Sequence, residues 1–119
     1  MNLYPLIFWP VAAGIDVLFD KRFPLDPTKT YTPEEIKAYN NLYFLSMTGI
    51  NVLYYVATKD ARGALVAQVG YMAGVEDVLY FVIKKQSIPA NLEYLPTYMN
   101  SPAKLLVNTA LSIIAAAIL

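Results

Sequence analysis

The sequence predicts an all-α fold: an integral membrane protein that forms a four-helix transmembrane bundle in a single transmembrane domain, residues 1–119. The first observation is composition, because 57% of the residues are hydrophobic and 15% are charged, whereas soluble domains average roughly 45–50% and about 25%. The second is that the apolar residues gather in four segments separated by polar or proline-containing connections. The alternative is a soluble helical bundle, since several segments are short and the third carries charge.

The first predicted helix covers residues 3–19, LYPLIFWPVAAGIDVLF. It lacks the basic leader and the small-residue cleavage site of a signal peptide, so we expect a membrane helix. Pro10 would kink this helix, which membrane helices tolerate when their neighbours compensate. Tyr4 and Trp9 are of the type that anchors a helix at the membrane interface.

The second predicted helix covers residues 33–58, and its start is strongly signalled. Thr32 is a capping residue, Pro33 suits the first helical position, and Glu35 completes a capping box. Glu34 and Glu35 are therefore interpreted as first-turn acids that match the helix dipole. A short turn, in which Asp60 is the candidate cap, leads to the third helix and makes the pair an antiparallel hairpin.

The third predicted helix, residues 62–84, is the segment around which the bundle is organised. It reads RGALVAQVGYMAGVEDVLYFVIK, a length that matches a bilayer at about 1.5 Å per residue. Gly70 and Gly74 form a GxxxG pair, which predicts close helix packing inside the bundle. The fourth helix, residues 102–119, follows a second capping signal at Ser101.

Basic residues orient the bundle. Two of them, Lys59 and Arg62, lie in the short turn, and seven border the two long connections: Lys21, Arg22, Lys29, Lys37, Lys84, Lys85 and Lys104. Because cytoplasmic loops carry the excess of lysine and arginine, we expect loops 20–39 and 85–101 in the cytoplasm and both termini outside.

Polar residues at helical spacing predict a polar layer inside the bundle, because lipid cannot satisfy their hydrogen bonds. The expected members of this polar core layer are Asn51, Gln68, Tyr80 and Asn108. On the third helix, four-residue steps place Gln68, Glu76 and Tyr80 on one face. Helical rise places Asn108 in the cytoplasmic half and Asn51 deeper.

Three acids belong to the same region: Asp16, Glu76 and Asp77 are the candidate catalytic residues. Carboxylates in a low dielectric either stay protonated or hold a cation, and Lys104 is the one base expected to reach them. The alternative is structural, with Glu76 and Asp77 bonded to neighbouring helices or to a partner subunit.

Composition also excludes several classes of site. The chain has no cysteine and no histidine, so disulfides, thiolate chemistry, histidine-ligated haem and Cys/His zinc sites are excluded within it. Its formal net charge is zero, which gives no electrostatic footprint for nucleic acid. We expect no cofactor and no metal site.

Residues 74–81, GVEDVLYF, resemble the P-x-E-E stretch, followed by apolar and aromatic residues, of membrane lycopene cyclases. Glycine stands where that family has proline, and Asp77 stands at the second glutamate. The resemblance covers one helix and implies an acidic pair that protonates a polyene. It does not by itself assign the chain to that family.

Two functions are compatible with these patterns. The first is a non-enzymatic one: a small accessory or scaffold subunit of a larger membrane complex, or a homo-oligomer, with membrane lipid and other subunits as partners. The second is a membrane enzyme or proton-coupled carrier for an apolar, lipid- or isoprenoid-like substrate, with Glu76 and Asp77 as a buried acid pair.

Overall fold

The computed structural model of the chain describes residues 2–19, 31–88 and 97–119, and the secondary structure in these ranges is helical. The elements are α1 (Leu3–Phe19), α2 (Pro33–Thr58), α3 (Ala61–Ala73), α4 (Val75–Ile83), the 3₁₀ helix η1 (Thr97–Met99) and α5 (Pro102–Ile118). The all-α prediction is therefore confirmed. The prediction of one continuous helix over residues 62–84 is wrong, because that segment folds as α3 and α4.

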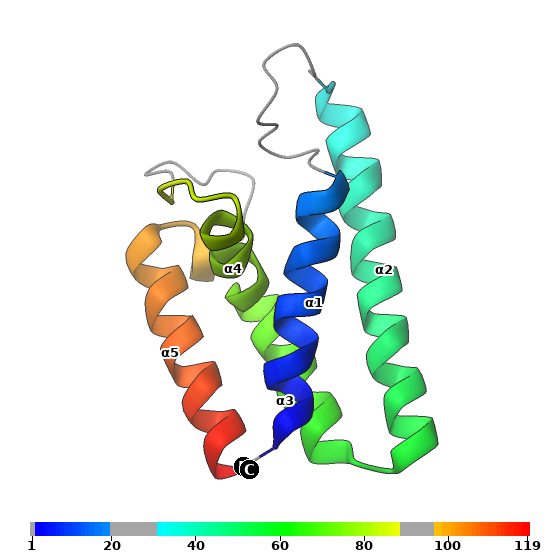
Figure 1. Cartoon of the computed structure of the whole chain (residues 1–119). Helices are drawn as coiled ribbons and strands as arrows, with labels where there is room; N and C mark the ends of the chain where they lie inside the picture. The colour runs from blue at the N-terminus through cyan, green and yellow to red at the C-terminus, as the bar shows by residue number, and fades with distance from the viewer. Residues whose placement is uncertain (1, 20–30, 89–96) are drawn as a thin grey trace.

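The helices are arranged in a bundle with two distinct ends (Figure 1). At one end, called the turn end below, the start of α1, the end of α5 and the turn between α2 and α3 lie together (Figure 1). The backbone N–H of Asn2 donates to Ala116 O at 2.8 Å, and the Asn2 amide donates to Asp60 Oδ2 at 3.2 Å. The opposite end, called the connection end, holds the end of α1, the start of α2, the end of α4 and the start of α5 (Figure 1).

The helix starts follow the capping residues that the sequence predicts. Thr32 Oγ1 accepts the Glu35 N–H at 3.2 Å, and the Thr32 hydroxyl donates to Glu35 Oε1. Asp60 Oδ1 accepts the Gly63 N–H at 2.9 Å, and Ser101 Oγ accepts the Lys104 N–H at 3.2 Å. Each cap satisfies a backbone donor that has no partner within its own helix.

Gly74 separates α3 from α4. Its φ of 115° lies in the region that favours glycine, and the two helices meet there at 67°. The Gly74 N–H donates to the carbonyls of Gly70 and Tyr71, the pattern by which a glycine ends a helix.

This break changes the meaning of the predicted GxxxG pair, which no longer lies on one continuous helix. A Cβ at Gly70 would lie 2.3 Å from Trp9 Cζ2, and a Cβ at Gly74 would lie 2.3 Å from Leu105 Cδ2. Both glycines therefore make room for a side chain of another helix. The prediction that the two glycines act together as a GxxxG packing motif is therefore not supported.

The main hydrophobic core lies where α1, α2 and α3 meet, with Val75 of α4 and Ala116 of α5 at its edges. Trp9 is 2% exposed, and its indole N–H donates to Ala67 O at 3.0 Å. The buried members of this cluster are Phe8, Trp9, Ala12, Tyr43, Met47, Ala67, Tyr71, Val75 and Ala116. A second cluster of Val78, Met99 and Leu105 joins α4, η1 and α5.

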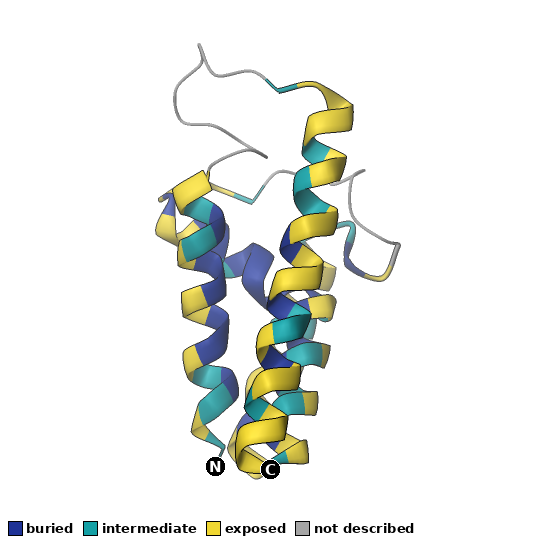
Figure 2. Cartoon of the chain, turned by 90° about the vertical axis from the view of Figure 1, so that its right-hand side faces the viewer, coloured by how far each residue is buried: buried dark blue, intermediate teal, exposed yellow. Residues whose placement is uncertain are grey.

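The outer surface is rich in large apolar side chains, and α2 is the most exposed of the long helices. Of its 26 residues, the buried ones are Tyr43, Met47 and Asn51, and Figure 2 shows most of its outward surface exposed. Taken singly, none of the described helices combines the length and apolar character needed to cross a bilayer; α3 and α4 meet both conditions only when counted together across their bend.

Candidate functional site

Three carboxylates are buried in α1 and α4. Asp16 is fully buried, and Glu76 and Asp77 are 2% and 4% exposed. Asp16 Oδ1 accepts a hydrogen bond from the Tyr39 hydroxyl of α2 at 2.5 Å. None of the three carboxylates is without an interaction partner. The burial that the sequence predicts for these candidate catalytic residues is therefore present in the fold.

The break at Gly74 gives Glu76 and Asp77 a local reason to be buried. Both lie in the first turn of α4, where backbone N–H groups without partners inside that helix make the positive end of the helix dipole. A carboxylate in that position gains about 0.3–1 kcal/mol, and up to about 2 kcal/mol when partly buried. The bend also means that Gln68 on α3 and Glu76 on α4 do not share one helix face, so that prediction is wrong.

Lys84 is the buried base of the connection end. It is 6% exposed, and its ammonium donates to the Tyr80 hydroxyl at 3.0 Å. Lys104, the base that the sequence predicts to reach the acids, is exposed, and its ammonium donates to Asn100 Oδ1 at 3.0 Å. Lys84 lies four residues after Tyr80, so the two side chains are neighbours on one face of α4. This spacing was visible in the sequence, but Lys84 was interpreted only as the end of the apolar segment.

The described acids do not form a metal-ligand set. No three of the acidic side chains in residues 2–19, 31–88 and 97–119 group as ligands for an ion. What this region holds is a buried lysine–tyrosine pair on α4 and carboxylates on α1 and α4. Chemically, such a set can hold or move a proton, which is the acid–base work that buried carboxylates perform.

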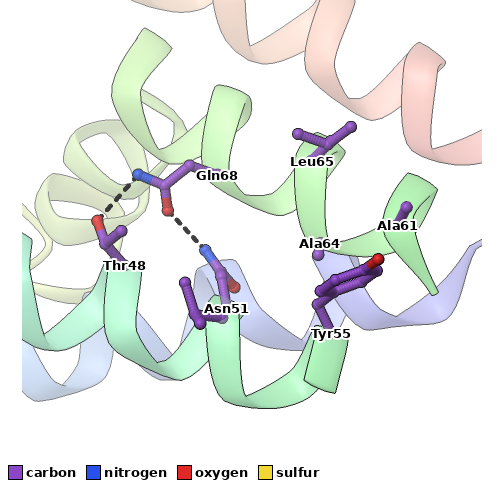
Figure 3. A pocket seen from close by; sticks show the side chains of 8 residues that line it. Thr48, Asn51, Tyr55, Ala61, Ala64, Leu65 and Gln68 are labelled. Carbon is purple, nitrogen blue, oxygen red and sulfur yellow. Dashed lines mark hydrogen bonds between the residues drawn. The ribbon is translucent and has the colours of Figure 1, made fainter. Parts of the chain in front are cut away.

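A second polar cluster, the amide network, joins α1, α2 and α3 nearer the turn end. The Tyr4 hydroxyl donates to Asn51 Oδ1 at 2.6 Å, and Asn51 Nδ2 donates to Gln68 Oε1 at 2.8 Å. Gln68 Nε2 in turn donates to Thr48 Oγ1 at 3.0 Å. Figure 3 shows the side chains of Thr48, Asn51 and Gln68 meeting between α2 and α3.

The amide network borders an open pocket of about 350 Å³ between α2 and α3. Tyr55, Ala61, Ala64 and Leu65 line the part of this pocket that lies toward the turn (Figure 3). The side-chain amides of Asn51 and Gln68 bond to each other, and that of Gln68 also bonds to Thr48. The remaining surface that lines the pocket is therefore mostly apolar. Its shape follows from small residues on α3, where two alanines leave room beside Tyr55.

The predicted polar core layer is divided between different partners. Asn51 and Gln68 are brought together in the amide network. Asn108 instead donates to Ala73 O at 2.9 Å and to Tyr98 O at 3.0 Å, and Tyr80 binds Lys84. The amide network and Asp16 also lie at different levels of the bundle. Asn51 bonds to Tyr4, and Tyr4 lies 12 residues before Asp16 on α1, or about 18 Å along the helix axis.

The turn end holds a half-buried carboxylate that accepts hydrogen bonds from several donors. Asp60 accepts hydrogen bonds from the Tyr54 hydroxyl at 2.6 Å, the Gly63 N–H at 2.9 Å and the Asn2 amide at 3.2 Å. The bond from Tyr54 is the largest of the effects that lower the pKa of Asp60, followed by those from Gly63 and Asn2. The ring of Tyr54 stacks on Tyr4, so Asp60 is linked to the amide network.

Comparison with protein-family models, with curated proteins and with solved structures finds no match to this chain. A function for this chain therefore has to be inferred from the arrangement of its own side chains.

Proposed function

We propose that this chain is a small integral membrane protein that serves as an accessory or scaffold subunit of a larger membrane complex, or assembles with copies of itself. The observation that carries the proposal is the outward face of α2. Leu45, Leu53 and Val56 on this helix are 67%, 69% and 57% exposed. An apolar face of this extent on a bundle helix is typical of a surface that lipid or a partner covers.

The distribution of polar groups supports a membrane setting. Asp16, Asn51, Glu76 and Asp77 are buried, while leucine, isoleucine and valine side chains are exposed on α1, α2, α3 and α5. Water favours the reverse arrangement, because burying apolar area stabilises a soluble fold. In lipid, the polar groups must instead find partners inside the bundle.

The lengths of α1 and α5 lie at the lower limit that this proposal needs, whereas α3 and α4 reach it only when counted together across their bend. α1 and α5 each contain 17 residues, and transmembrane helices begin at about 17 residues. In the proposed orientation the connection end, with Lys37, Lys84 and Lys104, faces the cytoplasm. The turn end, with both termini, then lies outside.

The test is native mass spectrometry of the gently solubilised protein from its source membrane. Co-purifying subunits or a defined oligomer are expected. Leu53→Trp, on the outward face of α2, should weaken that association, because a bulky ring disturbs a packed interface. Leu106→Trp on α5 is the matched control, since Leu106 is also exposed but lies on another helix. A stable monomer that captures no partner would overturn the proposal.

A second candidate function is a membrane enzyme or proton-coupled carrier for an apolar, lipid- or isoprenoid-like substrate. The burial of Glu76 and Asp77 favours it, together with the buried Lys84. Glu76 would carry the proton, and Asp77 and Asp16 would tune its affinity for it. In this case Glu76→Gln abolishes proton-coupled transport or turnover and leaves the fold intact. For a scaffold, the same change leaves assembly unaltered, because the amide keeps much of the hydrogen bonding.

A further inference from the structure

A second pocket, called the α1–α2 groove below, lies between these two helices near the connection end. Its volume is about 460 Å³, within the range of small-molecule sites. Ile15 and Phe19 of α1 form one wall, and Leu42 and Met47 of α2 contribute to the other. The groove is distinct from the amide network and was not predicted from the sequence.

Two tyrosines of α2 fix the floor of the α1–α2 groove. The Tyr39 hydroxyl donates to Asp16 and the Tyr43 hydroxyl donates to Ala12 O, so both rings are held against α1. The two rings lie 5.8 Å apart between centroids. Because these bonds satisfy the phenols, the faces and edges of the rings are what a ligand would meet.

The groove has a polarity along its length. On α2, Glu35, Tyr39, Leu42 and Ser46 line it at steps of four, three and four residues, so they follow one side of that helix. From Glu35 to Met47 the axial distance is about 18 Å at the rise of an α-helix. The groove is therefore acidic at one end and largely apolar over the rest of its length.

The acidic end is suited to a cation. Among the described side chains that line the groove, Glu35 is the charged one, and Lys37, two positions further along α2, is not among them. Phe19 and Tyr39 lie at the same end, with ring centroids 5.8 Å apart and planes at 53°. Two tilted aromatic rings beside a carboxylate attract an ammonium group through both charge and the ring quadrupoles.

We propose that the α1–α2 groove binds a single-chain amphiphile with an ammonium head, seated with its head at Glu35, Phe19 and Tyr39 and its chain toward Met47. Charge complementarity selects the head, and the apolar length of the groove selects the chain. This site is separate from the outward face of α2, so it does not depend on the accessory role.

The experiment uses two photoreactive probes on the full chain in a non-ionic maltoside detergent. One is a hexadecyl trimethylammonium carrying a diazirine in its chain, and the other is the hexadecanol with the same diazirine. We expect the ammonium probe to label the peptides that contain Ile15, Leu42 and Met47. Labelling should fall as ionic strength rises, because a solvent-accessible charge pair is screened by salt.

Glu35→Gln and Glu34→Gln provide a matched pair. Glutamine at position 35 still serves in a capping box, so the start of α2 is kept. We expect Glu35→Gln to reduce labelling by the ammonium probe about three- to fivefold, the upper range for an exposed ion pair. Glu34→Gln should leave labelling unchanged, since Glu34 does not line the groove.

A variant that keeps Glu35 gives an independent check. Ala38 lines the groove, and Ala38→Trp should fill it and abolish labelling there by either probe. The proposal is overturned if hexadecanol labels the groove as strongly as the ammonium probe, if both glutamine variants have the same effect, or if Ala38→Trp does not reduce labelling.

Discussion

The phenol of Tyr54 donates a 2.6 Å hydrogen bond to the carboxylate of Asp60, across the turn that joins α2 to α3. The same carboxylate accepts from the Gly63 backbone and from Asn2 at the start of the chain. The Asp60 carboxylate, which is half-buried, thus caps α3, binds Tyr54 near the end of α2 and binds Asn2 at the start of the chain.

These contacts predict an acid-dependent loss of stability. The Tyr54 hydroxyl, then the Gly63 N–H and Asn2, lower the pKa of Asp60 below its ordinary value of 3.8. A lowered folded-state pKa gives stabilisation that is present above the unfolded-state pKa and is lost as pH falls through the folded-state pKa. Below about pH 4, the melting temperature should therefore fall more steeply for the wild type than for Asp60→Asn.

Asparagine is the appropriate comparison at position 60, because it still caps a helix but does not titrate. Tyr54→Phe should reduce the pH dependence without removing it, since Gly63 and Asn2 remain as donors. Parallel melting profiles for the wild type and Asp60→Asn between neutral pH and pH 3 would contradict the prediction.

Gly74→Ala should destabilise the fold. An alanine would be held at a φ of 115°, and its Cβ would lie 2.3 Å from Leu105 Cδ2. Backbone strain of this kind costs on the order of 1–3 kcal/mol. Chemical unfolding followed by circular dichroism would measure the change in the free energy of unfolding.

Gly49→Ala is the control, because a Cβ at Gly49 meets nothing within 4 Å. In the middle of α2 this substitution should stabilise by up to about 1 kcal/mol, the helix preference of alanine over glycine. If both alanine variants stabilise equally, the break between α3 and α4 is not required by the fold.

Gly70→Ala should displace Trp9. The new Cβ would lie 2.3 Å from Trp9 Cζ2, and moving the ring would lengthen its bond to Ala67 O. We expect a loss of about 1–3 kcal/mol from overpacking and a red shift of the tryptophan fluorescence. The chain has one tryptophan, so the emission reports on this site alone. Gly14→Ala, which meets no neighbour, should leave the emission unchanged.

The amide network should give a measurable coupling between Asn51 and Gln68. Their side chains bond at 2.8 Å, so Asn51→Leu and Gln68→Met should be non-additive by about 0.5–2 kcal/mol. The readout is the free energy of unfolding in a double-mutant cycle. Asn51 paired with Asn108→Leu is the control, because Asn108 bonds to Ala73 and Tyr98 instead. Equal coupling in both cycles would show that the network is not specific.

Helix starts were the part of the fold most accessible from the sequence. Thr32, Asp60 and Ser101 cap α2, α3 and α5 as predicted. These caps depend on residues three positions apart, which makes them local and readable. The burial of Asp16, Glu76 and Asp77 was also predicted, because acids within apolar segments need a polar interior.

The break at Gly74 was not predicted, although the sequence contains a signal for it. A glycine followed within three residues by Glu76 and Asp77 is also the pattern of a helix end followed by the acidic first turn of a new helix. The apolar length of residues 62–84 favoured one continuous span instead. In the fold, the side chain of Leu105 packs against Gly74 from a distant part of the chain, a contact that no local sequence pattern reveals.

The α1–α2 groove could not be predicted, because it depends on how far apart two helices lie. Glu35 was correctly interpreted as a first-turn acid that pairs with Thr32. That Glu35 also lies at one end of the groove depends on the position of α1. Tyr39 and Tyr43 hold α1 in that position through their hydrogen bonds to Asp16 and to Ala12 O. Likewise, the sequence placed Lys84 at a boundary, whereas the fold buries it beside Tyr80.

The hydrogen bond from Trp9 to Ala67 has a consequence for the order of events on the ribosome. Its two residues are 58 positions apart in the chain. At a synthesis rate of roughly 5–20 residues per second, α1 waits roughly 3–12 s for this acceptor to be made. During that interval the indole N–H of Trp9 cannot reach its acceptor of the finished fold, so another group has to accept its hydrogen bond.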